Sequence, residues 1–179
     1  MDNKLIQTLL NEWIEKRDLP LVKLVVDGKL GAKSISAIKL FQKYTGLTPD
    51  GVPGAKTQYK LMFYKYPNFD EKEFACPCGH CGGFPVKVNE GALMLVQAVR
   101  NHFGKGVQIT SAIRCKSHNA AVGGVGDSQH LYGTAADIKV SGVAPSTVYS
   151  YANSINPNGG VGKYRTFTHV DWRGVRARW

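Results

Sequence analysis

The sequence lacks the long apolar run that a membrane-spanning helix needs. Its longest apolar stretches are only a few residues long, whereas crossing a bilayer takes roughly 20 consecutive residues. It also lacks a low-complexity tract, and its start, M-D-N-K, lacks the basic and then apolar arrangement of a signal peptide. At 179 residues we expect one ordinary domain, or a small module joined to a larger one.

Acidic residues are scarce. Thirteen Asp and Glu stand against 23 Lys and Arg, which gives a formal net charge of +10 that is spread over both halves of the chain. A diffuse basic surface favours polyanions such as nucleic acid, an anionic membrane or an acidic wall polymer. No basic helix or aromatic-interleaved stripe accompanies the charge, so we expect no specific nucleic-acid binding.

Cysteine is also scarce, and three of the four residues share one short segment. Cys76, Cys78 and Cys81 lie in C-P-C-G-H-C, and Cys115 is the only other cysteine. A single C-x-x-C without a second pair is a modest indication of zinc. The pattern is compatible with a zinc knuckle, a disulfide from the cluster to Cys115, or free thiols, and we expect a structural role.

The first part of the chain shows three helical patterns joined by two similar turns. Each turn contains Asp-Gly, in which glycine accepts a positive φ without penalty. Apolar residues at helical spacing, with Ser34 as the expected N-cap of the second helix, predict a three-helix module over residues 1–66. The predicted helices run over Lys4–Arg17, Ser34–Tyr44 and Ala55–Tyr66.

The two turns belong to longer motifs in a fixed order. V-D-G-x-L-G-x-x-S-x-x-A-I-x-x-F-Q spans Val26–Gln42, and G-L-x-x-D-G-V-x-G-x-x-T spans Gly46–Thr57. In this order they resemble the peptidoglycan-binding domain found beside many cell-wall hydrolases. The resemblance implies bacterial peptidoglycan as a partner; the alternative is a helical bundle that only packs on the rest of the chain.

From residue 67 onward, helices and strands mix without a regular βαβ repeat. This order predicts a compact α+β domain with an antiparallel sheet over 67–179, and the α+β class for the whole chain. The predicted elements are a helix over Asn89–Phe103, strands over Val107–Thr110 and Ala135–Val140, a helix over Pro145–Ile155, a Gly-rich turn over Gly159–Gly162 and a strand near Phe167–Trp172.

Two histidines and an aspartate have the spacing of a hydrolytic metal site. His130 and Asp137 enclose small residues in S-x-H-x-x-G-x-A-x-D, and His169 lies on the last predicted strand. The small residues would let a loop approach a strand closely. Two imidazoles and one carboxylate leave one position of a tetrahedral zinc open for water. Either histidine alone is more often a core residue, but together the three predict bound Zn²⁺.

The same segment resembles the zinc D-Ala-D-Ala carboxypeptidase family, which includes L-Ala-D-Glu endopeptidases of phage lysis systems. Four further segments agree: F-D-E-K-E-F-A-C-P-C from Phe69, S-A-I-R-C-K-S-H-N from Ser111, A-V-G-G from Ala121, and H-V-D-W-R-G-x-x-A-R-W from His169. The resemblance covers nearly all of 67–179. It implies a metallopeptidase fold with the same His, Asp and His as zinc ligands.

The resemblance also implies a role for Arg114, whose guanidinium could pair with a substrate carboxylate or support an oxyanion; the alternative is an ordinary surface salt bridge. Many relatives carry an acid three positions before the last zinc histidine, but this position is Thr166 here. We predict Asp171 as the general base, because residues two apart on a strand share a face. The alternative is that Asp171 orients His169 or pairs with Arg173.

Three residues near the predicted ligands are candidates for contact with substrate. Ser128 and Gln129 precede the first ligand and could instead cap its loop, while His118 could instead fix the loop. Trp172 and Trp179 are expected to pack the C-terminal strand.

These features predict a peptidoglycan hydrolase that cleaves a stem-peptide bond, either D-Ala-D-Ala or L-Ala-D-Glu. A wall-binding module without a signal peptide suggests a phage endolysin, made in the cytoplasm and acting on the wall after release; a prophage-derived bacterial enzyme fits equally. We expect a monomer that could also contact an anionic membrane. The alternative, motivated by Thr166, is a non-catalytic wall-binding protein that retains a structural zinc.

Overall fold

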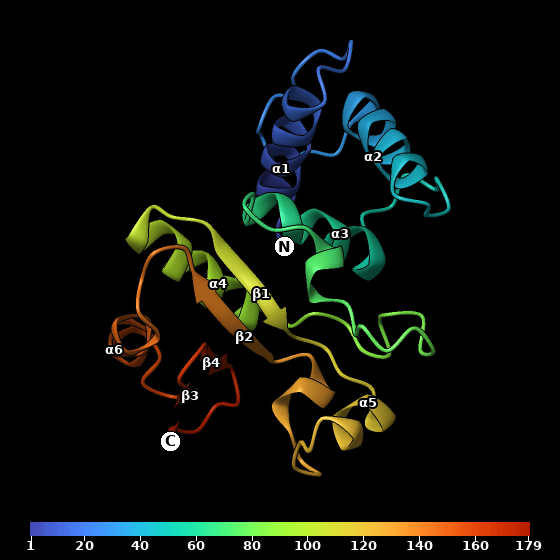
Figure 1. The fold of residues 1–179 in the computed structure, drawn as a ribbon. Helices are drawn as coiled ribbons and strands as arrows, with labels where there is room; N and C mark the ends of the chain where they lie inside the picture. Colours follow the sequence, from blue (N-terminus) through green and yellow to red (C-terminus); the bar gives the residue numbers. More distant parts are fainter. The chain divides into compact units, whose positions relative to one another are not determined.

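The computed structural model describes all 179 residues, which form two compact units, Met1–Pro67 and Asn68–Trp179 (Figure 1). The first unit is helical, and the second combines helices with a five-stranded sheet that is mostly antiparallel. The predicted α+β class is therefore confirmed. None of the helices combines the length and the apolar character that spanning a membrane requires.

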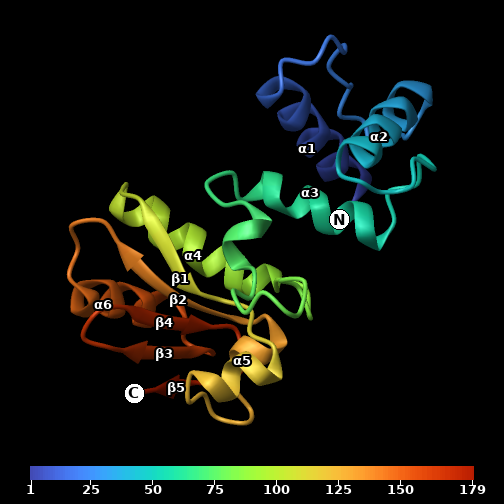
Figure 2. The ribbon, with the colours of Figure 1, turned by 45° about the vertical axis from the view of Figure 1, so that its right-hand side comes forward.

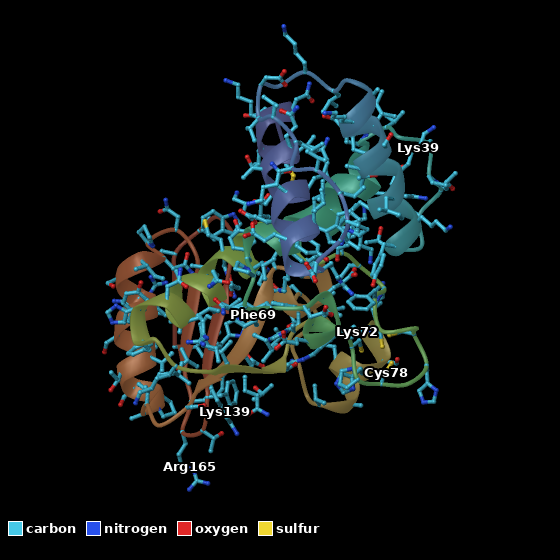
Figure 3. All side chains as sticks on the ribbon, turned by 90° about the horizontal axis from the view of Figure 1, so that it is seen from above. Lys39, Phe69, Lys72, Cys78, Lys139 and Arg165 are labelled. Atoms are coloured by element: carbon cyan, nitrogen blue, oxygen red, sulfur yellow. The ribbon has the colours of Figure 1, made fainter.

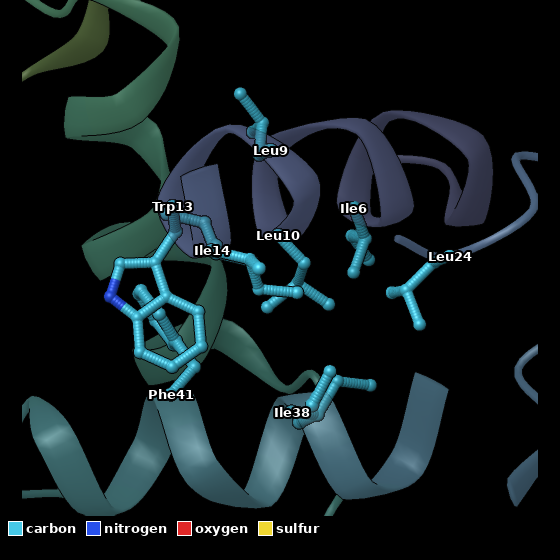
Figure 4. Close-up of a cluster of buried hydrophobic side chains, with 10 residues drawn as sticks. Ile6, Leu9, Leu10, Trp13, Ile14, Leu24, Ile38 and Phe41 are labelled. Atoms are coloured by element: carbon cyan, nitrogen blue, oxygen red, sulfur yellow. The ribbon is translucent and has the colours of Figure 1, made fainter. Parts of the chain in front are cut away.

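Three helices build the N-terminal unit around one apolar core. The rings of Trp13 and Phe41 meet edge to face at its centre, with centroids 5.2 Å apart (Figure 4). Ser34 does not cap the second helix as predicted, because the helix begins two residues earlier, after Gly31. The helices are α1 (Asn3–Lys16), α2 (Ala32–Tyr44) and α3 (Ala55–Lys65).

Two glutamines hold the two Asp-Gly turns in the same way. Gln7 accepts a bond from the backbone N–H of Gly28 at 2.7 Å and donates to the carboxylate of Asp27 at 3.0 Å. Gln42 makes the equivalent bonds with the turn Asp50–Gly51, at 2.9 and 2.7 Å. Both glycines have a positive φ, +84° and +80°. The resemblance between the turns is thus a structural repeat, and each glutamine replaces water as the partner of a tightly bent backbone.

The C-terminal unit is a sheet with two helices packed on it. Its strand order is β1-β2-β4-β3-β5, and all neighbours are antiparallel except β3 and β5 (Figure 2). The strands are β1 (Val107–Ser111), β2 (Ala135–Val140), β3 (Gly160–Lys163), β4 (Thr168–Asp171) and β5 (Ala177–Arg178). The helices packed on the sheet are α4 (Glu90–Phe103) and α6 (Pro145–Ile155). Shorter elements are η1 (Glu71–Phe74), α5 (Lys116–Ala121) and η2 (Gln129–Tyr132).

The Gly-rich segment 159–162 is not the turn that its composition predicts. Most of it forms β3, which pairs with β4. A Cβ at Gly160 would lie 2.0 Å from a carboxylate oxygen of Asp171, and one at Gly162 would lie 2.5 Å from the indole nitrogen of Trp179. The two glycines therefore leave room for the Asp171 carboxylate and the Trp179 indole. Glycine in a strand often marks such a close approach.

Alternation along β4 places the predicted ligands on the sheet face away from α6. The Thr168 hydroxyl donates to the carbonyl of Pro145, the first residue of α6, at 2.9 Å, so this side chain faces the helix. His169 then points to the other face. Asp137 lies directly opposite His169 in the β2–β4 ladder, and directly opposite residues project from one face.

Candidate metal centre and active-site cavity

The three predicted metal ligands lie together on this face of the sheet. His130 Nε2 is 3.4 Å, and His169 Nδ1 2.8 Å, from the same Asp137 oxygen, Oδ1. One ligand atom from each residue lies within 4.8 Å of the others, and all three side chains are buried. Two nitrogens and one carboxylate oxygen, with one position left for water, form a donor set of hydrolytic zinc sites. The residues therefore fit Zn²⁺.

The outer ring nitrogen of each histidine has a partner of its own. His130 Nδ1 is 2.5 Å from the carbonyl oxygen of Ala112, and His169 Nε2 is 3.0 Å from Oδ2 of Asp171. These acceptors hold a proton on the outer nitrogen and leave the inner nitrogen free to bind metal. Such partners are the usual support of metal-binding histidines.

Small residues bring the loop of His130 against the rest of the unit. Gly133 ends η2 with φ +68°, and a Cβ there would lie 2.2 Å from the carbonyl oxygen of Lys87. Ala135 and Ala136, at the start of β2, are buried completely. This is the close approach that the small residues of the motif predict.

Burial and mutual contacts set the protonation of the group. Burial would raise the pKa of Asp137, but hydrogen bonds with His130 and His169 outweigh it and hold this pKa well below its usual range. Burial would lower the pKa of His169, but its bonds to Asp137 and Asp171 raise the pKa overall. Without metal, the raised pKa of His169 favours its protonated form between the two carboxylates. A metal ion must displace that proton, so metal affinity falls as pH falls.

Arg114 lies beside the metal ligands. Its Nη2 donates to Asp137 Oδ2 at 2.8 Å, and its Nε donates to the hydroxyl of Ser111 at 2.9 Å. The Arg114 side chain is only 14% exposed, so this ion pair is not an ordinary surface salt bridge. Nη1 makes no hydrogen bond within the protein and remains available to a molecule in the cavity that Arg114 lines.

The metal ligands border a cavity of about 620 Å³. One wall is the glycine-rich loop between α5 and η2, and another is aromatic. In that wall Tyr164 stacks on Phe167, with centroids 4.3 Å apart, and the indole of Trp179 donates to the Tyr164 hydroxyl at 2.8 Å. Trp179 therefore lines the cavity besides packing on the last strands, whereas Trp172 packs over the first turn of α4. Sequence spacing gives no sign of this aromatic wall, because its members come together only in the folded sheet.

The peptidase M15 family matches residues 67–171, which include the whole metal group. The chain belongs to this family. A family of peptidoglycan binding domains matches residues 3–61. The zinc D-Ala-D-Ala carboxypeptidase of Streptomyces albus G is 30% identical over 128 residues, which cover 65% of this chain and 50% of that protein. The chain thus spans about half the length of the curated relative that it matches.

The family and the metal group agree with each other. The predicted zinc peptidase family is confirmed, and the His-Asp-His group fits Zn²⁺ as the cofactor. The resemblance of the N-terminal unit to a peptidoglycan-binding domain is confirmed as well.

The other predicted site residues of this M15 peptidase divide into two sets. Ser128 and Gln129 line the cavity. His118 does not; it lies on α5, where its backbone N–H donates to the sulfur of Cys115 at 3.4 Å. Thr166 lines a different, smaller hollow beside the start of α6. The absence of an acid at position 166 is therefore a weak argument against catalysis, because that side chain does not reach the metal cavity here.

Asp171 shares a face with His169, as its spacing predicts, but it does not line the cavity. The residue is completely buried. Its oxygens accept bonds from Arg173 at 2.6 and 2.8 Å and from the backbone N–H of Gly160 at 3.0 Å, besides the contact with His169. Burial would raise the pKa of Asp171, but His169 and Arg173 outweigh burial and lower it. These contacts favour the orienting alternative, and the base role stays a prediction.

Proposed function

We propose that this M15 peptidase hydrolyses a peptide bond in the stem peptide of bacterial peptidoglycan. The observation that carries the proposal is the union, in one chain, of a peptidase cavity with a His-Asp-His metal group and a unit that matches peptidoglycan binding domains. The name of the Streptomyces albus G relative points to the same polymer.

The N-terminal unit would hold the enzyme on its insoluble substrate. A second binding unit on the same chain raises the effective concentration of the peptidase at the wall. The net charge of +10 favours contact with anionic wall polymers or an anionic membrane. A chain inactivated by His130→Ala should therefore sediment with purified peptidoglycan, and the sedimented fraction should fall as salt is added.

The chain's own residues have separate tasks around the metal. When bound, zinc supplies a Lewis acid that activates water and polarises the scissile carbonyl. Ala112 and Asp171 keep the two histidines oriented toward it through their outer nitrogens. Arg114 steadies Asp137 through Nη2, and its free Nη1 is placed to bind a substrate carboxylate or the oxyanion formed on attack.

A carboxylate that accepts the proton from water has to open to the cavity. Asp171 has both oxygens engaged and no exposed surface. Asp127 and Asp137 are the two acidic residues that line the cavity, and Asp137 is a metal ligand. We therefore assign Asp171 to positioning His169 and place Asp127 as the candidate to accept the proton from water.

Two bonds fit this arrangement, because each offers a carboxylate for Arg114. In D-Ala-D-Ala carboxypeptidation it is the chain terminus, and in L-Ala-D-Glu endopeptidation it is the glutamyl carboxylate. Mass spectrometry of digested muropeptides separates them: loss of one alanine marks the first, and release of the stem beyond L-Ala marks the second. Digests identical to those of His130→Ala would contradict the proposal and favour a non-catalytic wall-binding protein.

We further propose that the enzyme acts as an endolysin on the intact wall, because one chain joins a peptidase unit to a unit that matches peptidoglycan binding domains. We also propose that it works as a monomer. Purified protein should then clear a suspension of permeabilised cells, and a chelator should prevent the clearing. Clearing of the suspension that persists with chelator would contradict the zinc mechanism.

A further inference from the structure

The four cysteines are brought to one place in the peptidase unit. Cys76, Cys78 and Cys81 lie on the loop between η1 and α4, where Figure 3 labels Cys78, and Cys115 caps the start of α5. All four sulfur atoms lie within 4.8 Å of one another. The Cys78 sulfur is 3.3 Å from that of Cys81 and 3.7 Å from that of Cys115.

We propose that these four cysteines, the four-sulfur group, bind a second zinc ion that is separate from the His-Asp-His site. In a tetrahedral site with zinc–sulfur bonds of about 2.3 Å, neighbouring sulfurs are roughly 3.8 Å apart, close to the spacing seen here. A disulfide needs its sulfurs at about 2.05 Å, and all four cysteines are free. Four thiolates fill the coordination sphere of zinc and leave no position for water, as in structural sites.

The backbone around the four-sulfur group is arranged to support thiolates. N–H groups point at three of the sulfurs, each at 3.4 Å: that of His80 at Cys78, that of Cys115 at Cys76, and that of His118 at Cys115. Such bonds stabilise the charged sulfur that a metal requires and orient the ligand. The loop can wrap the group because three of its glycines have positive φ: +73° at position 79, +68° at position 82 and +86° at position 83.

The second zinc would also steady the catalytic centre. Cys115 directly follows Arg114, which pairs with Asp137, and the nearby carbonyl of Ala112 holds His130. Besides the Cys115 N–H, this segment has one backbone hydrogen bond to the chain just before the cysteine loop. The N–H of Ile113 donates to the carbonyl of Phe74, the last residue of η1, at 3.1 Å. A metal at the four-sulfur group would therefore clamp the segment that positions both Arg114 and the first metal ligand. This inference does not depend on which substrate is cleaved.

Metal content of the full chain, purified without chelator, tests the proposal. We expect two zinc ions per wild-type chain and one in His130→Ala, where the four-sulfur group is intact. The double variant Cys78→Ser/Cys81→Ser should lose the second zinc. His80→Ala is the matched control, because this exposed residue lies between two of the cysteines in the sequence but outside the four-sulfur group, and it should keep both ions. One zinc in the wild type, with the same content in the double cysteine variant, would overturn the proposal.

A second measurement leaves the cysteines unmutated, in case the double variant does not fold. The His130→Ala chain is loaded with Co²⁺, which in a four-thiolate site gives an intense sulfur-to-cobalt absorption in the near ultraviolet. Absence of this band, or an intact mass that lacks two hydrogens for each disulfide formed, would overturn the second zinc. Either result would leave the proposed peptidase activity untouched, since that activity depends on the His-Asp-His site.

Discussion

The two groups of metal-ligand side chains in the peptidase unit are built differently. The His-Asp-His group is fully buried, and two of its members are opposite partners on neighbouring strands. The four-sulfur group lies on a loop and a helix start, and three of its members are partly exposed. The first leaves an open position beside a cavity, whereas the second closes on itself. A metal on rigid strands is suited to chemistry, and a metal on a loop is suited to holding that loop in place.

Removal of a ligand from the open site should have the largest effect. His130→Ala should lower the rate of muropeptide release by about 10⁴-fold, because the metal loses one of its ligands and the water it activates. The melting temperature should change much less, since the sheet stays paired. Release within tenfold of wild type, measured at saturating zinc, would show that this group is not catalytic.

Asp127 and Asp171 are carboxylates near the open site, and we expect their replacement to affect different steps. Asp127→Asn should lower kcat by about 10²-fold even at saturating zinc, because the residue lines the cavity. Asp171→Asn is the matched control and should keep most of its kcat under the same conditions. The reverse pattern would restore Asp171 as the base.

Asp171→Asn should act on the metal instead. Its loss should weaken zinc affinity by about 10- to 100-fold, since His169 loses the charged partner of its outer nitrogen. Added zinc should then restore most of the activity. Competition with a chromogenic chelator measures the affinity; an unchanged value would contradict the positioning role.

The closed site should govern stability more than rate. Cys78→Ser should lower the melting temperature by about 5 °C or more, because binding energy of a structural zinc is folding energy. Activity should fall by less than tenfold, through a loosened Arg114. Calorimetry with His80→Ala as control separates the effects, and equal melting temperatures for the two variants would argue against a clamp.

The smallest expected effect is on how the stability of the fold changes with pH, a trend that should reverse when zinc is bound. Because the pKa of His169 is raised above its ordinary value of 6.5, its stabilisation of the metal-free fold is fully present below that pH and is lost as pH rises through the raised value. Zinc-loaded protein should instead gain stability with rising pH, since the metal competes with the proton. Melting curves with and without zinc, and with His169→Gln, measure this difference.

Local sequence signals predicted much of the fold and the residues at the centre of the site. Helical spacing located five helices, and the spacing of His130, Asp137 and the small residues between them indicated a metal loop. Ser34 and the glycines of β3 misled, because a cap and a turn depend on where the neighbouring chain lies. Gln7 and Gln42 gave no signal, since each acts on a turn remote from its own position.

The sequence by itself determined the family and the helical module and predicted the three metal ligands, since these rest on residues at short, regular spacing. Only the tertiary structure decided that Cys115 lies beside the other three cysteines, that Trp179 lines the cavity and that Asp171 is buried behind His169. The physical reason is that such contacts join residues far apart in the chain or depend on what packs over them. Strand register and loop packing set these contacts, and no local pattern encodes them.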